Sequence, residues 1–194
     1  TTTISVNDAS SDNNFDSVAD QTVSVSTTDD DVAGFTVAET EGSTAVDESG
    51  TTDTFTVVLD AQPDSDVVVA ITSSDNGEAS SNSPLTFTSS NWDTPQTVTV
   101  TGVDDFLLDG TITSDLVVAI VDASSDNNFD AVADQTVSVS TTDDDVAGFT
   151  VAETEGSTSV TEAGGTDTFT VVLNAQPDSD VVLSIISSDT GEAT

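Results

Sequence analysis

No side chain in this sequence carries a positive charge. Its 194 residues include 37 Asp and Glu but no Lys, Arg or His, which gives a formal charge of −37. No salt bridge can therefore form between side chains, and the fold must tolerate or neutralise this charge from outside. Phosphate groups are bound largely by Lys and Arg, so the composition excludes nucleic acids and anionic membrane surfaces as partners.

Such an excess of one charge commonly indicates disorder. Here, however, 35% of the residues are hydrophobic and they follow a regular pattern. The protein supplies no counter-charge of its own, so a folded state requires cations from solution. Hard divalent cations bind to oxygen ligands, and Ca²⁺ is the first candidate among them.

Other site chemistries are excluded by the residues that are missing. The sequence has no Cys, so it has no disulfides, and thiolate or imidazole metal sites cannot form. It has no His, Lys or Cys to act as a catalytic base or nucleophile. A carboxylate pair could serve a glycosidase, but calcium accounts better for the acids, and we expect no enzyme activity. No apolar run approaches the length of a membrane span, and no signal peptide is recognisable.

A long internal repeat sets the domain organisation. Residues 15–79 recur as residues 129–193, an offset of 114, with 11 differences between 9–80 and 123–194. An offset of 114 residues corresponds to one β-sandwich domain. We therefore predict the end of one repeat at 1–31, a complete repeat at 32–145 and the start of the next at 146–194. Near-identity of the copies indicates that one domain is multiplied for length.

Alternation of apolar and polar residues predicts strands throughout, and no stretch shows helical periodicity. Clusters of Asp, Asn, Ser, Gly and Pro separate the strands, as at 62–66 and 73–77. The fold class is therefore all-β, and the spacing favours seven-stranded antiparallel β-sandwich domains, immunoglobulin-like, stacked head to tail. The strands expected within and beside the complete repeat are 54–59, 67–71, 85–88, 96–101, 116–121 and 136–141.

Acidic residues gather at the ends of these strands. Alternate strands of a sandwich end at the same pole, so acids from several loops should converge there. The residues expected to converge are Glu48, Asp75, Asp104, Asp105, Asp109, Asp143, Asp144 and Asp145. Two carboxylates about 4 Å apart repel by about 1 kcal/mol even in water, and by more when buried. Eight carboxylates would suit about three or four Ca²⁺ ions, with backbone carbonyls and water completing the coordination.

The motifs at these positions resemble the Calx-beta family. They are Val-Asp-Glu-Ser-Gly at 46–50, Ser-Asp-Asn-Gly-Glu-Ala at 74–79, Val-Asp-Asp at 103–105 and Asp-Asp-Asp-Val-Ala-Gly-Phe at 143–149. The resemblance implies calcium ligands at the eight acids above and, in the partial copies, at Asp29, Asp30, Asp31, Glu162 and Asp189. One departure is the apolar Phe106-Leu107-Leu108, where the family often has further acids. Close repeats of this kind also resemble giant secreted bacterial adhesins exported by type I secretion.

Other motifs have structural interpretations. The loops at 10–16 and 124–130 could hold a second metal site, but we interpret them as long turns pinned by Phe15 and Phe129. Trp92 could stack on a sugar ring, although a single Trp in such a loop is more often an anchor. Glu39, Glu41, Asp64 and Asp66 are interpreted as surface residues.

These observations predict a calcium-stiffened extender repeat of an extracellular bacterial surface protein, involved in adhesion and biofilms. Its partners would be the neighbouring repeats of the same chain. The connection after the triplet at 143–145 is short, so consecutive domains should form a stiff rod. Two alternatives stay open: a subunit of a self-assembling filament or sheath, in which copies contact one another, and a glycan-binding adhesin module.

Overall fold

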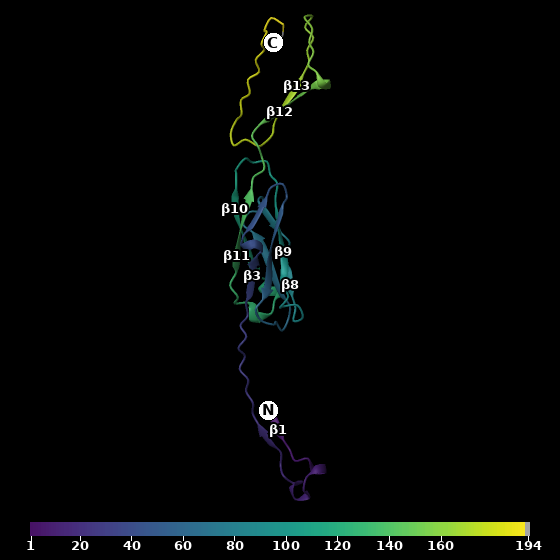
Figure 1. Ribbon diagram of the computed structural model, residues 1–194, viewed down its shortest axis with the longest axis vertical. Coiled ribbons are helices and arrows are strands. Elements are labelled where there is room, and N and C mark those ends of the chain that lie inside the picture. Colours follow the sequence, from purple (N-terminus) through teal and green to yellow (C-terminus); the bar gives the residue numbers. More distant parts are fainter. Residues whose placement is uncertain (193–194) are drawn as a thin grey trace. The chain divides into compact units, whose positions relative to one another are not determined.

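The computed structural model describes residues 1–192, so Ala193 and Thr194, at the end of the second copy, lie outside the described residues. Over this range the chain is all-β, and each of its helices is a single 3₁₀ turn of three residues. No helix of the described chain is long and apolar enough to cross a membrane. The chain divides into two compact units, Thr1–Val32 and Ala33–Thr194 (Figure 1).

The first unit, called the N-terminal unit below, is a hairpin with a long connection. Strand β1 (Thr2–Ile4) pairs antiparallel with β2 (Gln21–Val23). Two 3₁₀ turns, η1 (Asp8–Ser10) and η2 (Asn13–Phe15), lie between them. Asp12 caps η2 by accepting a hydrogen bond from the backbone N–H of Asn14 at 2.9 Å. This cap explains why the Asp-Asn-Asn sequence forms a turn here.

The second unit begins with two facing sheets, called the sandwich below. One sheet has the strand order β4-β11-β10-β6-β8, and the other has the order β3-β5-β9-β7. The strands are β3 (Phe35–Glu39), β4 (Thr44–Asp47), β5 (Thr52–Leu59), β6 (Val67–Ser73), β7 (Ala79–Ser81), β8 (Leu85–Phe87), β9 (Gln96–Gly102), β10 (Ile112–Ile120) and β11 (Gln135–Thr142).

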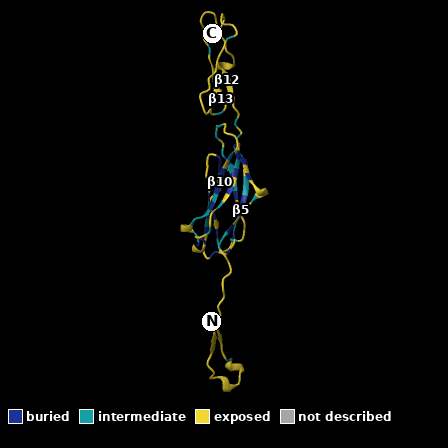
Figure 2. Cartoon of the chain, turned by 90° about the vertical axis from the view of Figure 1, so that its left-hand side faces the viewer, coloured by how far each residue is buried: buried dark blue, intermediate teal, exposed yellow. Residues whose placement is uncertain are grey.

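Alternation along each strand builds the core. In β5, Phe55, Val57 and Leu59 are buried, while the residues between them are partly exposed. Val67 and Val69 are likewise buried in β6 of the other sheet. These two residues and the three buried residues of β5 belong to one hydrophobic cluster. Buried residues in Figure 2 lie almost entirely within this sandwich. Burial of these apolar surfaces provides the main stabilisation of the fold.

The prediction of seven antiparallel strands needs correction. The sandwich has nine strand segments, and the chain changes sheet at every connection between consecutive strands from β3 to β10, while β10 and β11 lie in the same sheet. The first crossing uses the turn η3 (Thr40–Gly42), where Glu41 and Gly42 have φ values of 58° and 81°. Strand β4 then pairs parallel with β11, so the five-stranded sheet is mixed.

The rest of the second unit, residues 146–192, is called the C-terminal segment. Its strands β12 (Phe149–Glu153) and β13 (Phe169–Leu173) pair antiparallel, and η6 (Thr154–Gly156) follows β12. These elements repeat β3, β5 and η3 at the offset of 114 residues, but their side chains are mostly exposed. The three-domain organisation at 1–31, 32–145 and 146–194 stays a prediction.

Candidate metal centre

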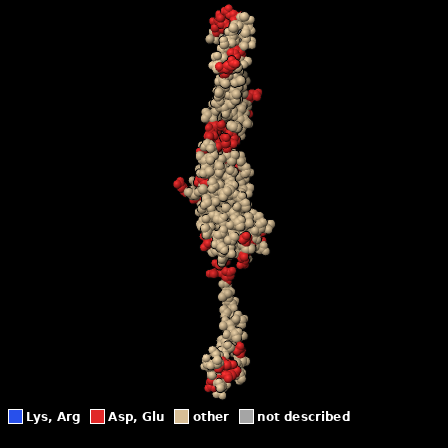
Figure 3. All heavy atoms as spheres, turned by 90° about the vertical axis from the view of Figure 1, so that its right-hand side faces the viewer, with Lys and Arg blue, Asp and Glu red and all other residues tan. Residues whose placement is uncertain are grey.

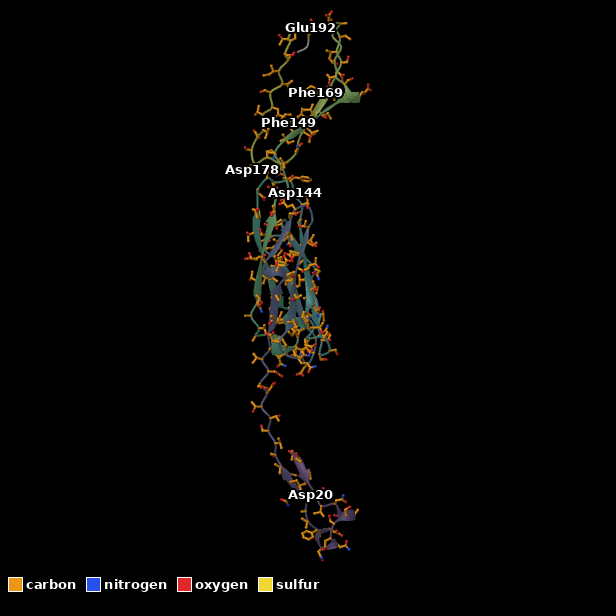
Figure 4. All side chains as sticks on the ribbon, in the orientation of Figure 1. Asp20, Asp144, Phe149, Phe169, Asp178 and Glu192 are labelled. Atoms are coloured by element: carbon orange, nitrogen blue, oxygen red, sulfur yellow. The ribbon has the colours of Figure 1, made fainter. Side chains whose placement is uncertain are left out.

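Loops from both sheets bring acidic residues together at one end of the sandwich. Glu48 follows β4, Glu78 precedes β7, and Asp109 lies in the loop between β9 and β10. Asp143 and Asp145 follow β11, where the labelled Asp144 marks the end of the sandwich (Figure 4). The acidic cluster is defined as Glu48, Glu78, Asp109, Asp143 and Asp145; Asp144 is not part of it.

The cluster contains two groups that share Glu48. One carboxylate oxygen from each of Glu48, Glu78 and Asp109 lies within 4.8 Å of the others. The same holds for Glu48, Asp143 and Asp145. On the face shown in Figure 3, acidic atoms gather in patches instead of spreading evenly, and no Lys or Arg is present.

Backbone contacts fix the two glutamates. The N–H of Glu48 donates to the carbonyl of Thr142 at 3.1 Å, which attaches it to the end of β11. The carbonyl of Glu78 accepts from the N–H of Val103 at 2.9 Å and from Oγ1 of Thr141 at 3.3 Å. A Cβ on Gly102 would overlap the carbonyl oxygen of Asp47, so only glycine permits this close approach.

Several carboxylates order the loops that carry them. Asp143 accepts from the backbone N–H of Gly110 at 2.9 Å and of Asp145 at 2.7 Å. Asp105 accepts from the N–H of Leu107 at 2.7 Å. The loop before β10 is thereby attached to the loop after β11.

The glutamates are buried without partners for their charge. Glu48 is 1% exposed and Glu78 is 5% exposed. One carboxylate oxygen on each, and Oδ2 of Asp145, is buried without a hydrogen-bond donor among the described residues. An unpaired buried charge costs several kcal/mol in real proteins, so this arrangement needs compensation.

Burial and like charges shift the acidity of the cluster. Desolvation, followed by repulsion from Asp105 and Asp143, raises the pKa of Glu48 from 4.5 to about 7. Desolvation and nearby acids also raise the pKa of Glu78 and of Asp145. A carboxylate held in this way stays partly protonated near neutral pH unless a cation replaces the proton.

The metal-free chain should accordingly lose stability as pH rises. Because the folded pKa of Glu48 lies above its unfolded value, protonation favours the folded state; this contribution is complete below pH 4.5 and disappears as pH rises through about 7. Urea unfolding in chelator across this window should show a falling free energy of unfolding. Glu48→Gln should flatten the profile, and a free energy that rises with pH would contradict the expectation.

The donor set fits a hard divalent cation. Every side-chain ligand that the two groups offer is a carboxylate oxygen, and Glu48, Glu78 and Asp145 each have one buried oxygen without a hydrogen-bond donor among the described residues. Glu48, Glu78 and Asp109 would hold one ion, and Glu48, Asp143 and Asp145 a second. An ion there would supply charge neutralisation and cross-linking of the loops.

The structure assigns different surroundings to the predicted ligands. Glu48, Asp109, Asp143 and Asp145 are brought together, and Asp104 and Asp105 lie close enough to affect the pKa values of the cluster. Asp75 influences Glu78, but its carboxylate accepts from the N–H of Gly77 at 2.9 Å. Asp144 and the acids of the partial copies are exposed and join no such group in the described chain; these are Asp29, Asp30, Asp31, Glu162 and Asp189.

Glu78 is the ligand candidate that sequence reasoning missed. It lies within the motif at 74–79, but the residue predicted as a calcium ligand from this motif is Asp75, which is exposed. No signal in the sequence identified it, because the burial of the neighbouring Ala79 at the start of β7 is evident only in the folded structure. An acid next to a fully buried residue is unusual unless its charge is compensated.

The loop at 124–130 is a structural turn. Asp126 is 5% exposed and accepts backbone hydrogen bonds from Asp64 at 2.6 Å and Ser65 at 3.0 Å. Hydrogen bonds from Asn128, Ser65 and Asp64 lower its pKa. Phe129, 1% exposed, anchors the turn in the core, and Trp92 packs partly buried against the same core.

Comparisons with known proteins find only distant similarity. No protein-family model and no curated protein matches the chain. Similar solved structures include the E. coli chaperone DraB, at 9% identity and a TM-score of 0.42, covering 61% of this chain and 59% of that one. Another is SSP-19, an MSP-domain protein like family member in Caenorhabditis elegans, at 21% identity and a TM-score of 0.35, covering 52% and 92%. A third is the apo form of the Calx CBD1 domain, at 14% identity and a TM-score of 0.40, covering 57% and 98%.

Proposed function

We propose that this chain is a calcium-dependent extender repeat of an extracellular bacterial surface adhesin, in which bound ions stiffen consecutive domains into a rod. The observation that carries the proposal is the pair of buried glutamates, Glu48 and Glu78, with unpaired carboxylate oxygens among further acids. A chain without Lys, Arg or His cannot neutralise them itself.

Calcium suits this site better than other divalent ions. Ca²⁺ accepts six to eight oxygen ligands in flexible geometry, whereas Mg²⁺ demands a near-ideal octahedron and retains water. Zinc and copper favour imidazole and thiolate ligands, which this chain lacks. Asp104, Asp105 and Asp75 provide further oxygens around the acidic cluster.

The position of the cluster supports a role at a domain junction. Only residues 146–148 separate the acidic triplet from β12. The apolar loop at 106–108 also contacts the C-terminal segment: the N–H of Gln176 donates to the carbonyl of Phe106 at 2.6 Å, and Leu107 forms a parallel bridge with Gln176. A connection this short, with contacts on both sides, favours a stiff junction over a flexible tether.

The junction is tested by removing two charges from the triplet. Asp144→Asn with Asp145→Asn should leave the strands of the sandwich intact, because the core contains neither residue. In calcium, small-angle scattering should show a shorter maximum dimension than for the parent chain, as the ordered junction becomes flexible. Chelator should shorten the parent in the same way.

A charge-matched control separates this effect from net charge. Asp93→Asn with Asp115→Asn removes the same two charges at exposed positions away from the triplet. It should scatter like the parent in calcium. If the junction variant also scatters like the parent, the triplet does not set the stiffness.

The glycan-binding alternative has less support. Trp92, its candidate platform for a sugar ring, is partly buried against the hydrophobic core. A stacking platform needs an exposed aromatic face, so the observed packing favours an anchoring role.

A further inference from the structure

The loop before β7 contains the one Asn-Gly pair of the sequence. Asn76 is followed by Gly77, and no other Asn of the chain precedes a glycine. The backbone nitrogen that follows an asparagine can attack the carbon of its side-chain amide. Glycine hinders this attack least, because it has no Cβ and its backbone rotates freely. This pair is therefore the position of the chain most prone to spontaneous loss of an amide.

The side chain of Asn76 is free to react. It is exposed and forms no hydrogen bond with the described residues. Asn82, by contrast, donates to the carbonyl of Thr97 at 3.4 Å and accepts from the N–H of Thr99 at 2.6 Å. Rotation of the amide toward the backbone breaks both bonds at Asn82 and none at Asn76.

The carboxylate of Asp75 lies beside the attacking nitrogen. The N–H of Gly77 donates to Oδ1 of Asp75 at 2.9 Å, so this oxygen can accept the proton that the nitrogen loses when it attacks. A Cβ on Gly77 would lie 3.2 Å from the same oxygen, which is closer than an ordinary contact. Ser73 fixes the start of the loop, because its Oγ donates to the carbonyl of Asp75 at 2.7 Å and accepts from its N–H at 3.2 Å.

The other side of the turn is held more weakly. The N–H groups of Glu78 and Ala79 donate to the carbonyl of Asp75 at 3.4 Å and 3.2 Å, longer than the usual distance of about 2.9–3.0 Å. Strand β7, which follows, has three residues and lies at the edge of its sheet. Backbone rotation that brings the nitrogen of Gly77 toward the amide of Asn76 therefore breaks few contacts, and such local opening costs little free energy.

The covalent step needs only water. A bond forms between the nitrogen of Gly77 and Cγ of Asn76, and the bond from Cγ to the amide nitrogen breaks. The proton of the attacking nitrogen passes by way of Asp75 to the leaving group, which departs as ammonia. Water then opens the cyclic imide. Opening at the side-chain carbonyl gives aspartate, and opening at the main-chain carbonyl gives isoaspartate, in which the main chain runs through Cγ.

We propose that Asn76-Gly77 is a deamidation site whose isoaspartate product displaces Glu78 from the acidic cluster. Isoaspartate adds one atom to the main chain two residues before Glu78, which is 5% exposed and shares a group of oxygens within 4.8 Å with Glu48 and Asp109. A small shift of the loop separates such a group. The effect on calcium binding rests on the proposed function, whereas the conversion itself does not.

The aspartate product should act differently. It keeps the length of the main chain and adds one negative charge to the loop. Charge in this loop reaches the acidic cluster, because Asp75 already contributes to the raised pKa of Glu78. Aspartate at this position should therefore favour a bound cation, while isoaspartate disfavours it.

The next repeat supplies a matched control. Residues 73–79 and 187–193 are identical except that Thr190 stands in place of Asn76. The local contacts are the same, since Asp189 accepts from the N–H of Gly191 at 2.9 Å and Ser187 donates to the carbonyl of Asp189 at 2.9 Å. Threonine thus fits this turn, and Asn76→Thr should keep the loop while removing the amide.

The conversion is tested by ageing the full chain in warm, mildly alkaline buffer with chelator and measuring peptide masses after chymotrypsin digestion. The peptide of residues 60–85 should gain about one dalton, located at Asn76 and not at Asn82. A protein isoaspartate methyltransferase should label the same peptide. Asn76→Thr should gain no mass there, and Gly77→Ala should gain it several-fold more slowly. Absence of the gain, or an equal gain at Asn82, would overturn the proposal.

Calcium titration calorimetry tests the consequence. The isoaspartate fraction, separated by ion exchange, should bind calcium about tenfold or more weakly than the fresh chain, as expected when a group that positions a metal site is displaced. Asn76→Asp should bind at least as tightly as the fresh chain. Equal affinity of the isoaspartate fraction and the fresh chain would overturn the displacement of Glu78. A fresh chain that binds no calcium would instead refute the proposed function, and the mass gain would still decide the deamidation site.

Discussion

Chelation of calcium is expected to lower the melting temperature of the isolated 32–145 segment by more than 10 °C. A ligand that binds only the folded state adds about 2.7 kcal/mol per site at a hundred times its Kd. Each kcal/mol corresponds to about 4 °C or more for a domain of this size, and the acidic cluster contains two overlapping groups. Differential scanning calorimetry in millimolar calcium and in chelator measures the shift, and equal melting temperatures would refute calcium-dependent folding.

Glu48→Gln in the full chain should have effects of opposite sign in the two conditions. In chelator it removes a buried charge that like charges surround, so the sandwich should become more stable. In calcium it removes the ligand shared by both groups, so the sandwich should become less stable. Glu162→Gln changes the exposed counterpart of Glu48 and should do neither. A change of the same sign in both conditions would indicate that Glu48 has only a structural role.

Phe129→Ala should destabilise the sandwich by about 3–5 kcal/mol, because truncation of a buried Phe loses its burial and leaves a cavity. Phe129 is 1% exposed within the core cluster. The matched control is Phe15→Ala, the same residue in the same local sequence but 54% exposed, which should change stability by no more than about 0.5 kcal/mol. Urea unfolding of the full chain gives both values, and equal losses would contradict the assigned cores.

Much of the acidic cluster followed from the positions of strand ends. Glu48, Asp109, Asp143 and Asp145 were predicted to converge because acids after alternate strands reach one pole, and the structure brings them together. Glu78 was not predicted as a ligand because its burial depends on the loop at 103–105 and on Thr141, which are distant in sequence. The crossing of the chain between sheets at η3 was also missed, since alternation within a strand does not reveal which sheet the strand joins.

Comparison of the two partial copies with the complete repeat distinguishes the features that local sequence determines from those that tertiary structure determines. Identical segments adopt the same local geometry in both places: Asp12 and Asp126 cap the same turn at 2.9 Å, and Glu41 and Glu155 have φ values of 58° and 56°. These features depend on hydrogen bonds and sterics over a few residues, so the local sequence is sufficient.

Burial does not follow from the local sequence. Phe15 and Phe129 share their neighbours but are 54% and 1% exposed, and Glu48 is buried while Glu162 is exposed. The alternation of side chains determines which residues can face a core, but a core exists only where strands from distant parts of the chain cover that face. The raised pKa of Glu48 arises in the same way, because desolvation and the like charges of Asp105 and Asp143 come from other loops. Tertiary structure alone thus gathers residues of a repeated acidic sequence into a cluster of buried carboxylates.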